Sequence, residues 1–256
     1  MPLGFRFGAG AVFCGAVGLL IIGCGSGPGT IASRNYLRSA EVLVGGGSAL
    51  SYTRVNQAGR PIEMGVRLSS DAIRNPPNGI QEVPLPVMVR ERGLPFDHIS
   101  LDWKPAGNDP AAIYNASHWE VHFYLMTPAE RQQITAQGPD LARVEAPPPA
   151  EAIPAGYLPT PGGVPTQGAH WFNPTAPEHS GAGFSHTLLY GFYNGRMVFL
   201  EPRVTQSMAQ SVTDVSQPIP QPQVYPKPGL YPTTYRVRRE ANGDISILLE
   251  NLVQRP

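Results

Sequence analysis

Histidine is the residue type in this chain whose spacing most clearly points to chemistry. All six histidines lie between His98 and His186. His118 and His122 fall in segment 117–126, where apolar and polar residues alternate, so the segment predicts a β-strand. On a strand, residues four apart share a face and lie about 13 Å from each other along the axis. Two imidazoles so placed can bind one metal ion if further ligands approach from neighbouring strands.

Further candidate ligands come from segments well separated in the sequence. His170 precedes Trp171 at the end of a Pro-rich stretch, and Glu201 lies in the second half of a predicted hairpin. Imidazole and carboxylate groups without thiolate suit a divalent transition metal: Zn, Mn, Fe or Ni. The predicted metal ligands are His118, His122, His170 and Glu201. Residues that orient these ligands or replace one of them are predicted to be Glu120, Tyr124 and His186.

The same histidines fit a second interpretation, in which they are interior polar groups that form hydrogen bonds with their neighbours. The protein would then be a non-enzymatic structural or interaction protein that forms homo-oligomers and holds no metal. The sequence has no Gly-x-Ser-x-Gly elbow, phosphate-binding loop or dinucleotide fingerprint. We therefore expect no nucleotide cofactor, and the sequence assigns no catalytic residue.

Composition indicates the fold class. The chain has 256 residues, with 19 Lys and Arg against 19 Asp and Glu, so its formal net charge is zero. This balance argues against the basic surface of a nucleic-acid-binding protein. Hydrophobic residues make up 41%, and 28 Gly with 29 Pro favour many turns and short strands. The prediction is a mainly β fold, an antiparallel β-sandwich or barrel with one short helix and long Pro-rich loops.

The strongest hairpin signal is Asn194-Gly195, a pair typical of two-residue turns. Counting outward from this turn places Tyr190 opposite Phe199 and His186 opposite Arg203. The predicted hairpin therefore brings Glu201 into a sheet, where it can approach the histidines of another strand.

Two further segments connect the predicted strands. Thr127-Pro128-Ala129-Glu130 is a capping box with Pro at the first helical position, and predicts a helix of about two turns up to Gly138. The Pro- and Gly-rich segment 146–167 predicts a long irregular loop. Because loops of this length are often functional, this one is the candidate lid over the metal site.

The N-terminal segment resembles a bacterial lipoprotein signal. Arg6 precedes an apolar run that ends in Leu20-Ile21-Ile22-Gly23-Cys24. A retained membrane anchor is the alternative, but the run is shorter than the ~20 apolar residues needed to span a bilayer. We expect a signal peptide over 1–23, lipidation of Cys24, a flexible tether over 24–44 and one β-rich domain over 45–253. The membrane is then a partner through the lipid, and the location is the cell envelope: the outer membrane or the periplasmic face in a Gram-negative cell.

Three motifs together carry a family resemblance. They are His118-Trp119-Glu120-Val121-His122-Phe123-Tyr124, Gly168-Ala169-His170-Trp171 and Phe199-Leu200-Glu201-Pro202. Over roughly residues 45–250 the chain resembles a bacterial family of unknown function, named after a sigma-E-controlled Thermus ring protein. The resemblance implies a mostly β fold, oligomerisation, and frequent export or lipid anchoring, with no established activity. Members commonly have His in a Gly-His-x-Pro stretch where this chain has Asn108, which removes one potential ligand.

Overall fold

The structure is a computed structural model that describes residues 35–256. The expected signal peptide, Cys24 and the tether up to residue 34 lie outside the described residues. The first two strands, β1 (Tyr36–Arg38) and β2 (Val42–Val44), both pair with β3 (Gly47–Val55). The described part of the expected tether is therefore already part of a sheet. No helix in the described range is long and apolar enough to cross a membrane.

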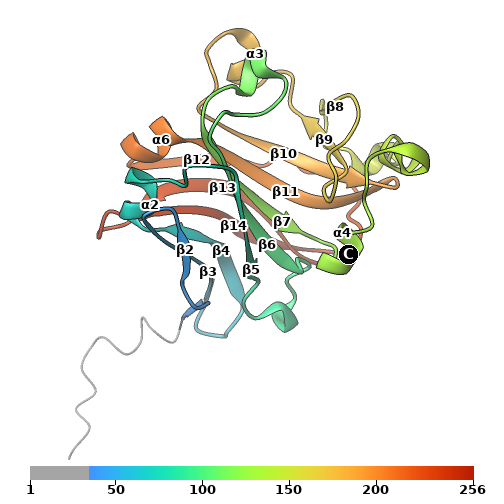
Figure 1. The fold of residues 1–256 in the computed structure, drawn as a ribbon. Coiled ribbons are helices and arrows are strands. Elements are labelled where there is room, and N and C mark those ends of the chain that lie inside the picture. The colour runs from blue at the N-terminus through green and yellow to red at the C-terminus, as the bar shows by residue number, and fades with distance from the viewer. Residues whose placement is uncertain (1–34) are drawn as a thin grey trace, which may run out of the picture.

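The described chain forms two antiparallel sheets of seven strands each, stacked as a sandwich (Figure 1). The first sheet has the order β1-β3-β4-β14-β13-β12, with β2 beside β3; its remaining strands are β4 (Pro61–Leu68), β12 (Asp214–Pro218), β13 (Gly229–Arg239) and β14 (Ile245–Arg255). The second sheet has the order β5-β6-β7-β11-β10-β9-β8, with bounds β5 (Gln81–Pro86), β6 (His98–Lys104), β7 (His118–Tyr124), β8 (Leu158–Pro159), β9 (Ala169–Phe172), β10 (His186–Tyr193) and β11 (Arg196–Thr205). The mainly β prediction is confirmed, as a sandwich whose described strands do not close into a barrel.

Short helices connect the strands, and there are more of them than the single one expected. The α-helices have four to six residues each: α2 (Ser70–Arg74), α3 (Ala111–Tyr114), α4 (Pro128–Arg131), α5 (Leu141–Val144) and α6 (Gln206–Ser211). Single 3₁₀ turns are η1 (Arg90–Arg92), η2 (Gly138–Asp140), η3 (Ala150–Ala152) and η4 (Pro177–Ser180).

Helix α4 begins as predicted but ends early. Its capping box between Thr127 and Glu130 is complete. The helix stops at Arg131 instead of continuing to Gly138, because the Asp140 carboxylate accepts hydrogen bonds from the backbone N–H groups of Thr135 and Ala136. Ala136 also has a φ of 53°, which an α-helix cannot include.

The Pro-rich segment 146–167 is more ordered than the sequence predicts. It contains η3 and strand β8, and β8 pairs with β9 at the edge of the second sheet. A second Pro-rich connection follows β12 and ends at Gly229, where β13 begins.

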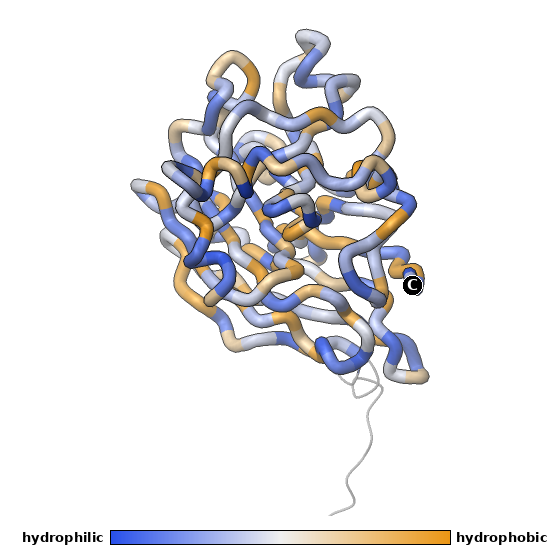
Figure 2. The backbone as a smooth tube through the Cα atoms, turned by 90° about the vertical axis from the view of Figure 1, so that its right-hand side faces the viewer, coloured by the Kyte–Doolittle hydropathy of each residue, from blue (hydrophilic) through white to orange (hydrophobic). Residues whose placement is uncertain are grey.

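The core lies between the two sheets and follows the alternation predicted for β6 and β7. Ile99, Leu101 and Trp103 of β6 and Trp119, Val121 and Phe123 of β7 are buried there against strands β4, β13 and β14. Figure 2 shows hydrophobic and hydrophilic residues alternating along much of the chain. Because side chains alternate across a strand, the intervening polar residues of β6 and β7 must point to the outer side of the second sheet.

A β-bulge in the hairpin of β10 and β11 corrects the predicted register. Phe192 pairs with Met197 as expected, but Gly191 pairs with Phe199, so Val198 is an extra residue on β11. Tyr190 consequently faces Leu200, and His186 faces Val204. A shift of one residue exchanges the two faces of a strand, so every later residue of β11 faces the opposite side from the one predicted.

The bulge generates the first prediction. Deleting Val198 should turn Glu201 and Arg203 into the apolar space between the sheets, where buried charges are costly. We expect the deletion variant to show no cooperative unfolding transition in urea. Val198→Ala is the matched control, because it keeps the chain length and should cost only about 2 kcal/mol. A deletion variant as stable as this control would show that the register does not matter.

Candidate functional site

The outer face of the second sheet is polar and nevertheless buried. His118, Glu120 and His122 of β7 and Glu201 and Arg203 of β11 are each at most 4% exposed. The connections that contain α3, β8 and η4 lie over this face, at the upper side of the molecule in Figure 1. The charged groups of this face must therefore be neutralised within the protein or by a bound ligand.

Three of the four predicted ligands come together on this face. His122, His170 and Glu201 lie on β7, β9 and β11, and one donor atom from each falls within 4.8 Å of the others. His122 Nε2 is 3.6 Å from Glu201 Oε1, and His170 Nε2 is 3.3 Å from Glu201 Oε2. Two ligands of one tetrahedral ion, each about 2.1 Å from it, lie about 3.4 Å apart. The spacing of these donors fits one metal ion.

The donor atoms of this group also lack other partners. His122 Nε2, His170 Nε2 and Glu201 Oε2 are buried and form no hydrogen bond with any described residue. An unpaired buried polar group costs about 1–3 kcal/mol, so several at one point call for an explanation. A metal ion would bind all three atoms at once.

Asp102 approaches the other side of the His122 ring. Its Oδ2 is 3.5 Å from His122 Nδ1, and its Oδ1 accepts a hydrogen bond of 2.6 Å from Ser100. Metal-bound imidazoles commonly direct their second nitrogen at a carboxylate, which fixes the orientation of the ring. Burial lowers the pKa of His122 to about 4, so the imidazole is neutral near pH 7, as a metal ligand must be.

Aromatic rings hold both imidazoles in place. Tyr124 stacks on His122 at 5.5 Å, and Phe199 packs edge-on against His122 at 4.9 Å and against His170 at 5.3 Å between ring centroids. Phe199 lies over Gly191 of β10, where an added Cβ would come within 2.1 Å of the ring. Gly191 therefore provides the space that this ring needs between the two histidines.

Arg203 is the buried cation of the site. Its Nε donates to Glu201 Oε1 at 2.6 Å and lies 3.2 Å from Glu120 Oε1. Burial favours the neutral acid of Glu201, but the charge of Arg203 outweighs that effect and holds the pKa of Glu201 well below its usual value. Glu201 is therefore an ionised carboxylate near pH 7. Burial and the charge of Glu120 raise the pKa of Asp102 to about 7, and the attraction of Lys104 offsets this only in part.

His118, the fourth predicted ligand, is not part of the group. Its Nε2 lies 3.1 Å from Glu120 Oε1 and its Nδ1 lies 2.7 Å from the Ala116 carbonyl, so both nitrogens have partners. Glu120 also contacts Arg203, Lys104 and Asn108, which occupies its oxygens. A second arrangement of Asp102, Glu120 and His122 could in principle hold an ion, but its Glu120 is already neutralised.

Of the other residues predicted to orient or replace a ligand, Tyr124 lies at the site and His186 does not. The ring of Tyr124 stacks on His122. The Arg131 guanidinium also lies over the Tyr124 ring, 4.1 Å from its centroid. His186 is on the wrong side of the sheet: its Nδ1 lies 2.9 Å from the hydroxyl of Tyr235 on the first sheet. The bulge explains this, because it places His186 opposite Val204 on the core side.

Two residues of the site were not predicted, Asp102 and Arg203. Alternation along β6 does place Asp102 on the polar face, but only the pairing of β6 with β7 brings it beside Glu120 and His122. Arg203 could have been found only with knowledge of the bulge.

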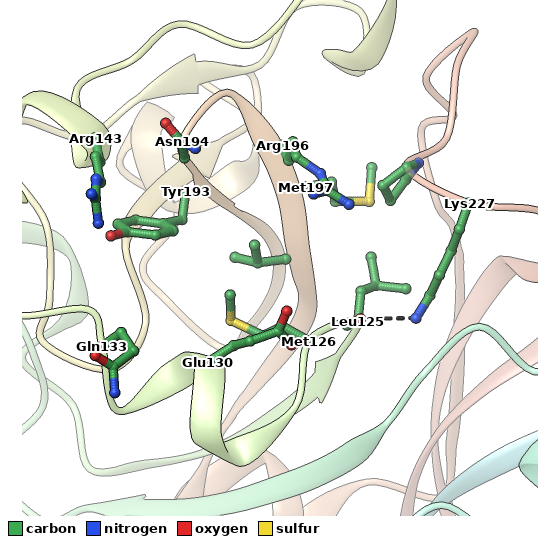
Figure 3. A pocket seen from close by; sticks show the side chains of 12 residues that line it. Leu125, Met126, Glu130, Gln133, Arg143, Tyr193, Asn194, Arg196, Met197 and Lys227 are labelled. Atoms are coloured by element: carbon green, nitrogen blue, oxygen red, sulfur yellow. Dashed lines mark hydrogen bonds between the residues drawn. The ribbon is translucent and has the colours of Figure 1, made fainter.

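A separate cavity of about 260 Å³ lies at the tip of the β10–β11 hairpin (Figure 3). Met126, Met197 and Leu125 line it, and Lys227 donates to the Leu125 carbonyl at its edge. It includes none of the candidate ligands.

Comparison with known families agrees with the resemblance seen in the sequence. Residues 56–103 match the family described as TTHB210-like, hypothetical protein TTHB210. The resemblance to this family, typified by a Thermus protein, is thus confirmed over β4, β5 and β6. The matched segment includes Asp102 and none of His122, His170 and Glu201. Searches among curated proteins and among solved structures gave no match.

The buried charges lead to the second prediction. Arg203→Met should leave Glu120 and Glu201 without their buried cation and lower the free energy of unfolding by about 3–5 kcal/mol. The measurement is urea denaturation at pH 7. Arg74→Met is the control, because Arg74 pairs with Asp71 at the surface and should cost at most about 1 kcal/mol. Equal losses in the two variants would contradict the role given to Arg203.

Proposed function

We propose that this chain is a lipid-anchored cell-envelope protein that binds one divalent transition-metal ion through His122, His170 and Glu201. The observation that carries the proposal is the convergence of three buried donor atoms that have no hydrogen-bond partner among residues 35–256. Two neutral imidazoles and one carboxylate suit Zn, Mn, Fe or Ni. Three protein ligands leave a coordination position open, as in catalytic rather than structural metal sites.

The proposed location depends on the N-terminal sequence. The segment that ends in Leu20-Ile21-Ile22-Gly23-Cys24 supports export and lipidation of Cys24. The lipid would hold the domain at the outer membrane or the periplasmic face of a Gram-negative cell.

Self-association is also part of the proposal. Leu43 is 83% and Ile80 75% exposed. The two lie near each other, since the side-chain amide of Gln81 donates to the Leu43 carbonyl. Neighbouring exposed apolar side chains favour a contact with a second copy. Light scattering after size-exclusion chromatography measures this self-association as the mass of the particle in solution.

Elemental analysis provides the third prediction. The full chain, purified without a metal-affinity tag and equilibrated with Zn, Mn, Fe or Ni, should contain about one equivalent of metal per chain. His122→Gln should lose this metal. His118→Gln and His186→Gln should keep it, because the nitrogens of the first have other partners and the second faces the core.

Two outcomes would contradict the proposal. Wild-type protein that takes up none of the four metals would leave the histidines as interior polar groups and favour the metal-free structural protein. Loss of metal from His118→Gln but not from His122→Gln would move the site to another part of the sheet.

Asp102 gives the fourth prediction. Asp102→Asn should weaken the affinity for zinc by about 10–100-fold, because the amide orients His122 less well than the carboxylate does. Competition with a chelating dye measures this affinity. Asp97→Asn is the control: Asp97 is also next to a histidine, His98, but that histidine is not in the ligand group. Equal affinities of wild type and Asp102→Asn would show that Asp102 does not position the ligand.

A further inference from the structure

A larger cavity of about 720 Å³ opens beside the proposed metal site and shares His170 with it. Leu189, His170 and Arg203 of the second sheet contribute to its lining. The walls come from the connection around α3, from segment 160–167 and from His179 of η4. Cavities of roughly 300–1,000 Å³ are typical of sites for small organic molecules. The candidate lid segment therefore forms one wall of a cavity large enough for a small molecule.

Arg203 has hydrogen-bond donors that are not used by any other described residue. Its side chain is buried and donates to Glu201 through Nε. Neither of its Nη groups forms a hydrogen bond with another described residue, and the residue lines the cavity. A guanidinium presents paired N–H donors in a plane that matches the two oxygens of a carboxylate.

Lys104 is a second cation of the cavity wall. Its Nζ lies 3.6 Å from Glu120 Oε2, and its side chain is only 18% exposed. Arg203 and Lys104 together balance the charges of Glu120 and Glu201. Asp109 adds one negative charge to the wall. A divalent ion bound to Glu201 would add two positive charges beside the cavity and make the sum of these charges positive, so the complete site would attract an anion.

The chemistry of the cavity walls indicates the chemistry of the rest of the ligand. Ile113, Val164, Phe172 and Leu189 offer apolar surface, while the ring of Tyr114 lies against the Arg203 guanidinium, 5.2 Å from its central carbon. A fully hydrated inorganic anion would leave these walls unused. A planar anionic head with an apolar or aromatic body fits both parts of the cavity.

We infer that this cavity binds a small organic carboxylic acid, with its carboxylate at Arg203 and Lys104 and its apolar body between α3 and segment 160–172. The inference rests on the proposed function for the positive charge of the ion beside the ligand. It adds to that function the class of molecule that meets the metal.

The test uses 2-naphthoate as probe, its uncharged analogue 2-naphthamide, and inorganic phosphate. Each is titrated by calorimetry into the full chain loaded with zinc, and the zinc content of the same sample is measured. We expect 2-naphthoate to bind in a one-to-one complex, at least about tenfold more tightly than either of the other two. Lys104→Met should weaken 2-naphthoate binding by about tenfold, because one cation of the wall is lost.

Two further variants separate the cavity from the rest of the molecule. Ile113→Trp should fill the cavity and abolish 2-naphthoate binding while the zinc content stays unchanged. Lys227→Met removes a lysine at the separate cavity of Figure 3 and should bind 2-naphthoate like wild type.

The outcomes distinguish failure of the carboxylate inference from failure of the proposed metal-binding function on which it rests. A chain that holds zinc but binds 2-naphthoate no better than 2-naphthamide overturns the carboxylate inference and leaves the metal site standing. Tighter binding of phosphate overturns it as well. A chain that takes up no zinc overturns the proposed function through the metal analysis itself, and the inference with it.

Discussion

The central strands of the second sheet, β6, β7 and β11, are buried on both faces, and this constraint governs the rest of the structure. One face packs against the first sheet with apolar side chains, as in any sandwich. The other face carries the carboxylates of Asp102, Glu120 and Glu201 under a cover of loops. Buried carboxylates need cations, protons or metal ions, because water cannot solvate them there. The need to compensate these buried negative charges therefore determines how the side chains of the outer face are arranged.

Each carboxylate is compensated in a different way. Glu120 is surrounded by Arg203, Lys104 and His118, and Asp102 is close to protonation at neutral pH. Glu201 shares Arg203 but directs its second oxygen toward His170 without forming a hydrogen bond. This remaining oxygen and two imidazole nitrogens have no hydrogen-bond partner among the described residues, which supports the proposed metal site over ordinary buried polar packing. Glu201 thus links the part of the face that is neutralised internally to the part proposed to need an ion.

Local sequence determined more of the fold than of the site. The alternation along β6 and β7 and the Asn194-Gly195 turn predicted the strands, the core and the hairpin, because these depend on neighbouring residues. His118 and His122 could not be distinguished, since both share one face and only contacts across strands give His118 its partners. The bulge at Val198 could not be predicted, because no local pattern marks an extra residue inside an apolar strand. The bulge keeps His186 out of the candidate site and places Arg203 in it.

The position of His170 has a consequence for local stability. His122 and Glu201 lie on adjacent central strands, β7 and β11, whereas His170 lies on the four-residue strand β9, next to the edge strand β8. Short elements near a sheet edge open with a small free energy, independently of global unfolding. An ion bound by all three residues would attach β9, and through β8 the covering segment before it, to the centre of the sheet. Amide hydrogen exchange over residues 158–172 would then report how much of the protein holds the ion.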